Sequence, residues 1–127
     1  MKYFFDENFS PKLARAINEL DAYNEVLSTV DEFGRGLPDE ELIPKIGQLE
    51  GILITQDFKI QKTQQLYQLY QDHSVGVFFF KFISGSKLWD INVGVIKLWI
   101  KLTGLAEKTH PPFGYRVMVN RGKFDKL

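Results

Sequence analysis

Residues 51–55 read GILIT, and residues 75–82 read VGVFFFKF. Neither stretch alternates between apolar and polar residues as a strand with one solvent-exposed face would. Continuous apolar runs of this length are typical of strands that are buried on both faces of a sheet. A sheet is buried in this way when helices cover each of its faces, so the two stretches favour an α/β fold.

The segments on either side of these runs alternate between strand and helix patterns. Strands are expected at residues 2–5, 26–30, 51–55, 75–82 and 115–120, and helices at residues 11–21, 39–49, 59–72 and 87–103. This alternation predicts a single three-layer α/β/α domain with a mostly parallel sheet. A loop is expected at residues 104–112 and a basic tail at the end of the chain. We therefore divide the chain into a domain at 1–103 and a C-terminal extension at 104–127 that packs on the same domain.

The composition excludes several classes of protein. Hydrophobic residues make up 44% of the 127 residues and charged residues 25%, which excludes a disordered or fibrous chain. The chain has no cysteine, which excludes disulfides and thiolate metal sites. No apolar run reaches the ~18 residues of a membrane span, and Asp6 and Glu7 stand where a signal peptide would be apolar. We expect a cytoplasmic protein that has no membrane partner.

Charge is divided unevenly along the chain. Residues 1–57 hold twelve acidic and five basic side chains, a net charge of −7, whereas residues 58–127 hold four acidic and eleven basic ones, a net charge of +7. A divalent-metal site needs clustered carboxylates, and a nucleic-acid backbone needs lysine and arginine. The asymmetry favours such a pair of functions, although unrelated solvated faces would give the same sums.

Three aspartates stand where the carboxyl edge of the sheet would gather them. Asp6 ends the first expected strand, Asp57 ends the third, and Asp39 begins the helix before the third strand. Ligands of open α/β sheets bind at this edge, and oxygen ligands without cysteine favour Mg²⁺ or Mn²⁺ over Zn²⁺. Each aspartate also has a structural alternative: Asp6 as a turn residue, Asp39 as a first-turn acid, and Asp57 as a helix N-cap.

Three motifs resemble those of small PIN-like proteins. They are FFDENFSPKLARAI at residues 4–17, GLPDEELI at residues 36–43 and ILITQDF at residues 52–58. Their order and spacing are similar to those of the family, over roughly residues 2–100. The resemblance implies a PIN-like fold and a metal-dependent ribonuclease, in many relatives the toxin of a type II toxin–antitoxin system. It makes residues 1–103 the PIN-like nuclease domain.

The resemblance also implies roles for individual residues. Asp6, Asp39 and Asp57 would hold Mg²⁺ or Mn²⁺, and Glu40 would replace Asp39 if the helix were rotated by one position. Asn8 and Thr55 would be neighbouring polar groups that orient ligands or substrate. We further expect cations to meet the RNA phosphates, near the site and along the strand: Lys12, Lys59, Lys62, Lys97, Lys101, Arg116 and Arg121. For each of these cations the alternative is a solvated surface position.

One departure from the family pattern keeps other functions open. Relatives often carry a further acid just after Thr-x-Asp, whereas this chain continues Asp57-Phe58-Lys59. The loss of a carboxylate leaves one metal, weak metal binding, or an inactive scaffold or RNA-binding module as alternatives. A phospho-accepting receiver is a third hypothesis, in which Asp57 is phosphorylated, but it needs a lysine after the last strand. Lys81 and Lys123 are poor candidates for that lysine.

Two further expectations concern partners and the tryptophans. A toxin needs an antitoxin that covers its acidic site, and the aromatic-rich second half of the chain could also support a homodimer. Trp99 lies in an apolar stretch and is expected to pack in the core, whereas Trp89, near a helix start, is expected to be partly exposed.

Overall fold

The computed structural model describes residues 1–56 and 60–127, and for residues 60–64 it describes the backbone. The elements in chain order are β1 (Lys2–Phe5), α1 (Pro11–Leu20), β2 (Glu25–Ser28), α2 (Thr29–Phe33), α3 (Asp39–Gln48), β3 (Gly51–Gln56), α4 (Ile60–Asp72), β4 (Gly76–Lys81), α5 (Leu88–Thr109), β5 (Phe113–Met118), the 3₁₀ helix η1 (Val119–Arg121) and β6 (Lys123–Lys126). Among the described helices, none combines the length and apolar character that crossing a membrane requires.

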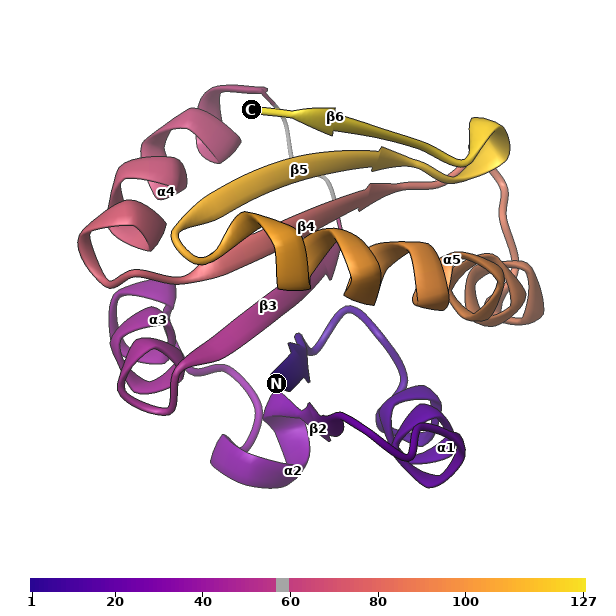
Figure 1. Cartoon of the computed structure of the whole chain (residues 1–127), viewed down its shortest axis with the longest axis horizontal. Coiled ribbons are helices and arrows are strands. Elements are labelled where there is room, and N and C mark those ends of the chain that lie inside the picture. The colour runs from indigo at the N-terminus through magenta and orange to yellow at the C-terminus, as the bar shows by residue number, and fades with distance from the viewer. Residues whose placement is uncertain (57–59) are drawn as a thin grey trace.

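The strands form one six-stranded sheet in the order β2-β1-β3-β4-β5-β6 (Figure 1). The first five strands are parallel, and β6 pairs with β5 in the antiparallel direction. In the centre of the sheet, Phe5 stands opposite Ser28 of β2 on one side and Ile54 of β3 on the other. The predicted α/β class with a mostly parallel sheet is confirmed.

Two cores, one on each face of the sheet, make the three layers. Tyr3 and Phe5 of β1 face α1 and α5, and they pack in one buried cluster with Trp99 of α5. Phe4, between them in sequence, faces the opposite side, where α3 contributes Ile43 and α4 contributes Leu66 to a second cluster. Successive side chains of a strand point to opposite faces, which is why an unbroken apolar run serves both cores. Trp99 is buried as predicted, and Trp89 is exposed.

Helix α1 begins where the sequence predicts. The Ser10 hydroxyl accepts a hydrogen bond from the Lys12 backbone N–H at 3.2 Å, and Pro11 is the first helical residue. A serine cap with proline at the first position is a strong start signal. Leu13 and Ile17, one turn apart, are buried against the sheet.

Two elements differ from the predicted boundaries near the middle and end of the chain. The strand predicted at 26–30 ends at Ser28, because the Ser28 hydroxyl caps the short helix α2 by accepting from the Val30 N–H at 3.2 Å. Helix α5 continues past the predicted end at residue 103 to Thr109, and the predicted loop shrinks accordingly. Ala106 is fully buried in the core of the α1–α5 face, so packing carries the helix across Gly104.

The end of the chain adds a strand where a basic tail is predicted. β5 occupies residues 113–118 rather than 115–120, and β6 then returns along it. Phe124 of β6 packs against the core at the edge of the sheet, and Lys101 of α5 donates to the Gly122 carbonyl at 2.6 Å. Residues 104–127 thus supply the end of α5 and two strands of the same sheet, and the boundary placed at residue 103 falls inside α5.

Candidate active site

The strand order creates a crevice between β1 and β3. Helix α1, which follows β1, covers one face of the sheet and leads to β2, whereas α4, the helix after β3, covers the other face and leads to β4. The chain therefore departs in opposite directions from the carboxyl ends of two adjacent strands. Ligands of open α/β sheets bind at such a switch point. Asp6 follows β1 here, and Thr55 is the penultimate residue of β3.

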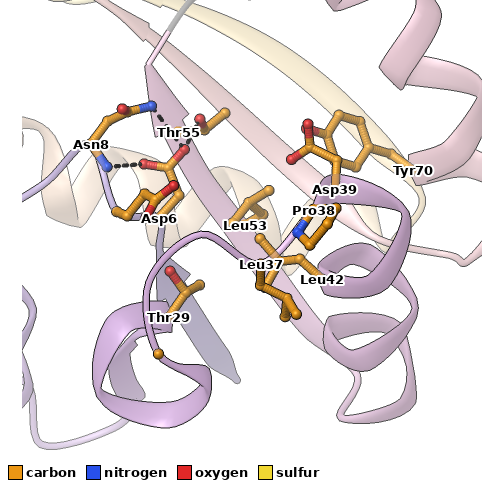
Figure 2. A pocket seen from close by; sticks show the side chains of 12 residues that line it. Asp6, Asn8, Thr29, Leu37, Pro38, Asp39, Leu42, Leu53, Thr55 and Tyr70 are labelled. Atoms are coloured by element: carbon orange, nitrogen blue, oxygen red, sulfur yellow. Dashed lines mark hydrogen bonds between the residues drawn. The ribbon is translucent and has the colours of Figure 1, made fainter.

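Asp6 is held in place by hydrogen bonds to its backbone N–H and to both of its carboxylate oxygens. Its backbone N–H donates to the Ile54 carbonyl at 3.0 Å, continuing the pairing of β1 with β3. The Asn8 backbone N–H donates to Oδ1 of Asp6 at 2.9 Å, and Nδ2 of Asn8 lies 3.3 Å from Oδ2. The buried Thr55 hydroxyl donates to the same Oδ2 (Figure 2). The carboxylate is thereby fixed at the end of the strand with little rotational freedom.

The environment makes the negative charge of Asp6 costly. Asp6 is only 8% exposed. Burial raises the pKa of its carboxyl to about 6, the hydrogen bonds from Thr55 and Asn8 oppose the rise, and the charges of Asp39 and Glu7 add to it. A buried carboxylate among like charges is a group that a bound cation would stabilise strongly.

A cavity of about 240 Å³ opens beside Asp6. Its lining residues come from the ends of β1 and β3, from α2, from the start of α3 and from α4: Asp6, Glu7, Asn8, Thr29, Gly34, Leu37, Pro38, Asp39, Leu42, Leu53, Thr55 and Tyr70. Oxygen-bearing side chains stand on two sides, with Leu53 and Leu42 forming an apolar floor between them (Figure 2). The cavity therefore has polar walls and an apolar floor.

Asp39 stands across the cavity from Asp6. It is the first residue of α3, directly after Pro38, and it lies beside Tyr70 of α4 (Figure 2). Tyr70 is 1% exposed, and burial raises the pKa of its hydroxyl, with further contributions from the charges of Asp39 and Asp6. The Tyr70 hydroxyl thus interacts electrostatically with both Asp39 and Asp6, so the two carboxylates share one electrostatic environment.

A hydrogen bond ties the loop before α3 to the end of β1. The Gly36 N–H donates to Oε2 of Glu7 at 3.0 Å. Gly34 and Gly36 have φ angles of 81° and 77°, a backbone region that glycine reaches without strain. The loop therefore turns tightly and delivers Pro38 and Asp39 to the cavity.

Comparison with known families identifies the scaffold. Residues 1–82 match the family described as a PIN-like domain, which spans the chain from β1 to just beyond β4.

The chain belongs to the PIN-like domain family.

Its scaffold is accordingly of the nuclease type. No significant match was found among curated proteins or among solved structures. The matched region of the PIN-like domain contains Asp6, Asp39 and the cavity between them, whereas all of α5 and the last two strands lie beyond it.

Four of the predicted site residues meet at this cavity of the PIN-like domain. Asp6, Asn8, Asp39 and Thr55 all line it. Glu40 is exposed on α3 and does not line the cavity, so Asp39 is the α3 carboxylate that faces Asp6. They converge because the strand ends and the α3 start share one edge of the sheet.

The remaining predicted site residues lie away from the cavity or outside the residues that the structure describes. Asp57 and Lys59 lie outside the described residues, as does the side chain of Lys62. Lys12 is exposed on the first turn of α1 and does not line the cavity. The four predicted phosphate contacts on α5, β5 and η1 also lie away from the cavity lining: Lys97, Lys101, Arg116 and Arg121.

Sequence reasoning missed three polar members of the site. Glu7 was adjacent to Asp6 in the first motif and could have been included on that ground. Thr29 lies at the start of α2 just after the Ser28 cap, a helix that the sequence did not predict. Tyr70 belongs to the buried stripe of α4, where nothing in the sequence distinguishes it from an ordinary core tyrosine.

The donors in the cavity suit a hard divalent cation. The carboxylates of Asp6 and Asp39 and the Thr55 hydroxyl supply oxygen only, as Mg²⁺ and Mn²⁺ prefer. Over residues 1–56 and 60–127 the structure holds no cluster of three or more histidine, aspartate or glutamate side chains in a metal-binding arrangement. The carboxylates of Asp6 and Asp39 are thus in place, whereas Asp57, which comes one residue after the end of β3 in the sequence, lies outside the described residues.

Proposed function

We propose that this PIN-like protein is a metal-dependent ribonuclease. Asp6, Asp39 and Asp57 would hold Mg²⁺ or Mn²⁺ at the carboxyl edge of the sheet. The proposal rests mainly on one observation: the buried, hydrogen-bonded Asp6 carboxylate faces Asp39 across a polar cavity at the switch point of the sheet. A site built only to stabilise the fold would have no reason to place two carboxylates around one cavity.

The cation, when bound, would supply an activated water and polarise a phosphoryl oxygen. The chain's own groups prepare the site for it. The Asn8 N–H and the Thr55 hydroxyl fix the Asp6 oxygens before substrate arrives, so little reorganisation is needed on binding. Leu53 and Leu42 keep the floor of the cavity apolar, which strengthens the electrostatic interactions above it.

The substrate side of the proposal assigns the basic residues. Lys12, Lys59 and Lys62 would meet phosphates close to the cleavage point, and the cations of the second half would bind the strand further away. We also propose that the protein acts in the cytoplasm as the toxin of a toxin–antitoxin pair. An antitoxin could neutralise it by placing a basic side chain between Asp6 and Asp39, because that position is electrostatically favourable for a positive charge.

Cleavage of a labelled single-stranded RNA with Mn²⁺ tests the activity. Asp6→Asn, Asp39→Asn and Asp57→Asn should each lower the rate by at least a hundredfold, because each removes a charge that the cation needs. Asp72→Asn is the matched control: Asp72 is exposed at the far end of α4 and outside the cavity. Wild-type cleavage by all three site variants would overturn the proposal.

One observation favours a second candidate, a PIN-like module that binds RNA without cleaving it. The Asp6 oxygens already receive hydrogen bonds from Asn8 and Thr55, so the folded chain satisfies this carboxylate unaided. Such a module would bind RNA equally well with Mn²⁺ or with a chelator. The structure adds no support for the receiver hypothesis, which needs a lysine directly after the last parallel strand. That strand, β5, ends at Met118, and the next lysine in the sequence is Lys123; Lys81 is the last residue of β4.

A further inference from the structure

Helix α5 carries an apolar face that no other part of the described chain covers. Six large side chains form this surface, which we call the α5 face: Leu20 (76% exposed), Tyr23 (92%), Trp89 (76%), Val93 (43%), Ile96 (44%) and Ile100 (86%). Four of them recur along α5 at steps of four, three and four residues, so each lies beside the next on one side of the helix. The other two come from the end of α1 and the loop after it.

The size of the α5 face exceeds what a monomer usually exposes. With ~100 Å² of apolar surface for an aliphatic side chain and ~200 Å² for an aromatic one, the exposed fractions sum to roughly 600 Å². Apolar patches of this size on soluble monomers mark interaction sites. Two copies of the face would together bury about 1,200 Å², which reaches the lower end of the range for a specific protein–protein interface.

The shape of the α5 face is self-complementary. A groove of about 530 Å³ lies at one end, between the end of α1 and α5, and is walled by Leu20, Tyr23, Ile96 and Ile100. At the other end Trp89 projects into solvent, three turns before Ile100. If a second copy packs antiparallel to the first, Trp89 of each copy faces the groove of the other. This is the arrangement that a two-fold interface requires.

The charges beside the α5 face also fit a two-fold arrangement in which the two copies of α5 run antiparallel. Asp90 follows Trp89, and Lys97 follows Ile96; both are exposed on α5. When the two copies of α5 pack side by side and antiparallel, Asp90 of each comes toward Lys97 of the other. A parallel arrangement would instead place Asp90 level with the other Asp90 and Lys97 level with the other Lys97, and no opposite charges would meet.

We propose that the α5 face is the interface of a two-fold homodimer, in which Trp89 of each copy enters the groove of the other. The proposal is independent of the proposed nuclease activity, because none of its residues lines the Asp6–Asp39 cavity. The Asp6–Asp39 cavities of both copies keep their own complete set of lining residues.

Sedimentation equilibrium or light scattering from low to high micromolar concentration tests the proposal. The wild-type protein should reach twice its chain mass of 14.7 kDa. Ile100→Glu and Trp89→Glu should each raise the dimer dissociation constant at least tenfold, since each places a charge where the side chain of one copy is buried against the other. Both positions are exposed in the single chain, so far-UV circular dichroism should be unchanged, as should the melting temperature at a concentration where the wild-type protein is monomeric. Trp89 fluorescence should shift to shorter wavelength as the wild-type dimer forms.

The matched control is Leu49→Glu, an exposed leucine at the end of α3 on the opposite face of the sheet. It should leave the dissociation constant unchanged. A monomer at every concentration would overturn the proposal. A dimer that survives both α5 variants, a dimer that Leu49→Glu weakens as much, or an open-ended assembly would overturn it equally.

Discussion

At the scale of single residues, the ionised Asp6 carboxylate lowers the stability of the fold and is also a ligand of the proposed metal site. The folded chain raises its pKa from 3.8 to about 6, so at pH 7 the carboxylate is ionised in an environment that disfavours the charge. Each unit of such a shift corresponds to about 1.4 kcal/mol. Functional sites commonly carry a cost of this kind, which the bound ligand then offsets.

Removal of the Asp6 charge should therefore stabilise the metal-free protein. Asp6→Asn keeps the size of the side chain and leaves an oxygen for the Asn8 N–H, while it discharges a buried group. We expect an increase in the free energy of unfolding of roughly 1–3 kcal/mol at pH 7 without metal, measured by urea denaturation. Asp72→Asn, at an exposed position, should change it by less than about 0.5 kcal/mol. A large destabilisation by Asp6→Asn would mean that the carboxylate is mainly structural.

Asp21 shows the opposite behaviour on the other side of the sheet. Burial alone would raise the pKa of its carboxyl, but hydrogen bonds from the Trp99 indole at 2.8 Å, from Asn24 and from backbone amides outweigh it and lower the pKa to about 2. The ionised form is thus favoured in the folded state. It stabilises the fold above pH 4, the unfolded value, and this stabilisation is lost as the pH falls toward 2.

The pH dependence of Asp21→Asn checks this assignment. Wild-type protein should be more stable than the variant by about 1 kcal/mol above pH 4, after allowance for solvent screening at the surface. The difference should shrink between pH 4 and pH 2. Thermal melts of both proteins across this range measure it, and a constant difference would contradict the assignment.

The sequence identified the site residues that lie next to strand ends. Asp6 and Asp39 could be placed because parallel strands bring their carboxyl ends to one edge, whereas Asn8 and Thr55 were implied by the resemblance to the family motifs. Tyr70 could not, because it enters the cavity from a helix whose register on the sheet depends on tertiary packing. Local patterns determine which residues end strands, whereas only the packed fold determines what lines the space between them.

At the scale of elements, two glycines in helices have opposite roles. A Cβ at Gly47 of α3 would lie 2.5 Å from the His73 carbonyl oxygen, so glycine allows the end of α3 to approach the end of α4. A Cβ at Gly104 of α5 would meet nothing within 4 Å. The first glycine is required by packing, and the second only weakens its helix.

Alanine at the two positions should have opposite effects on stability. Gly47→Ala forces the backbone of α3 away from that of α4, and we expect a loss of about 1–3 kcal/mol. Gly104→Ala should gain about 0.5–1 kcal/mol from the higher helix propensity of alanine. Chemical denaturation of the pair measures both changes. Equal effects would contradict the described approach of α3 to α4.

The elements that the sequence missed are those made by tertiary contact. Helix α2 is five residues long and depends on the Ser28 cap, and β6 exists because it pairs with the edge strand β5. Neither carries enough apolar periodicity to be recognised alone. The long strands β3 and β4 were predicted because burial on both faces leaves an unmistakable apolar run.

At the scale of the whole molecule, the proposed cation should stabilise the entire fold. A ligand that binds only the native state stabilises it by mass action, by about 2.7 kcal/mol at a hundred times its dissociation constant. For a chain of this size we expect Mn²⁺ to raise the melting temperature by roughly 10 °C. Differential scanning calorimetry should show the increase in the wild-type protein and its loss in Asp6→Asn. An equal increase in both would mean that Mn²⁺ binds elsewhere.

The most direct test of the central claim is the anomalous scattering of a crystal grown with Mn²⁺. We predict a manganese peak bound by oxygens of Asp6, Asp39 and Asp57, at roughly 2.0–2.3 Å as for hard divalent cations. A crystal that shows no peak beside Asp6, with its oxygens still bonded only to Asn8 and Thr55, would contradict the metal site and the nuclease function proposed for it.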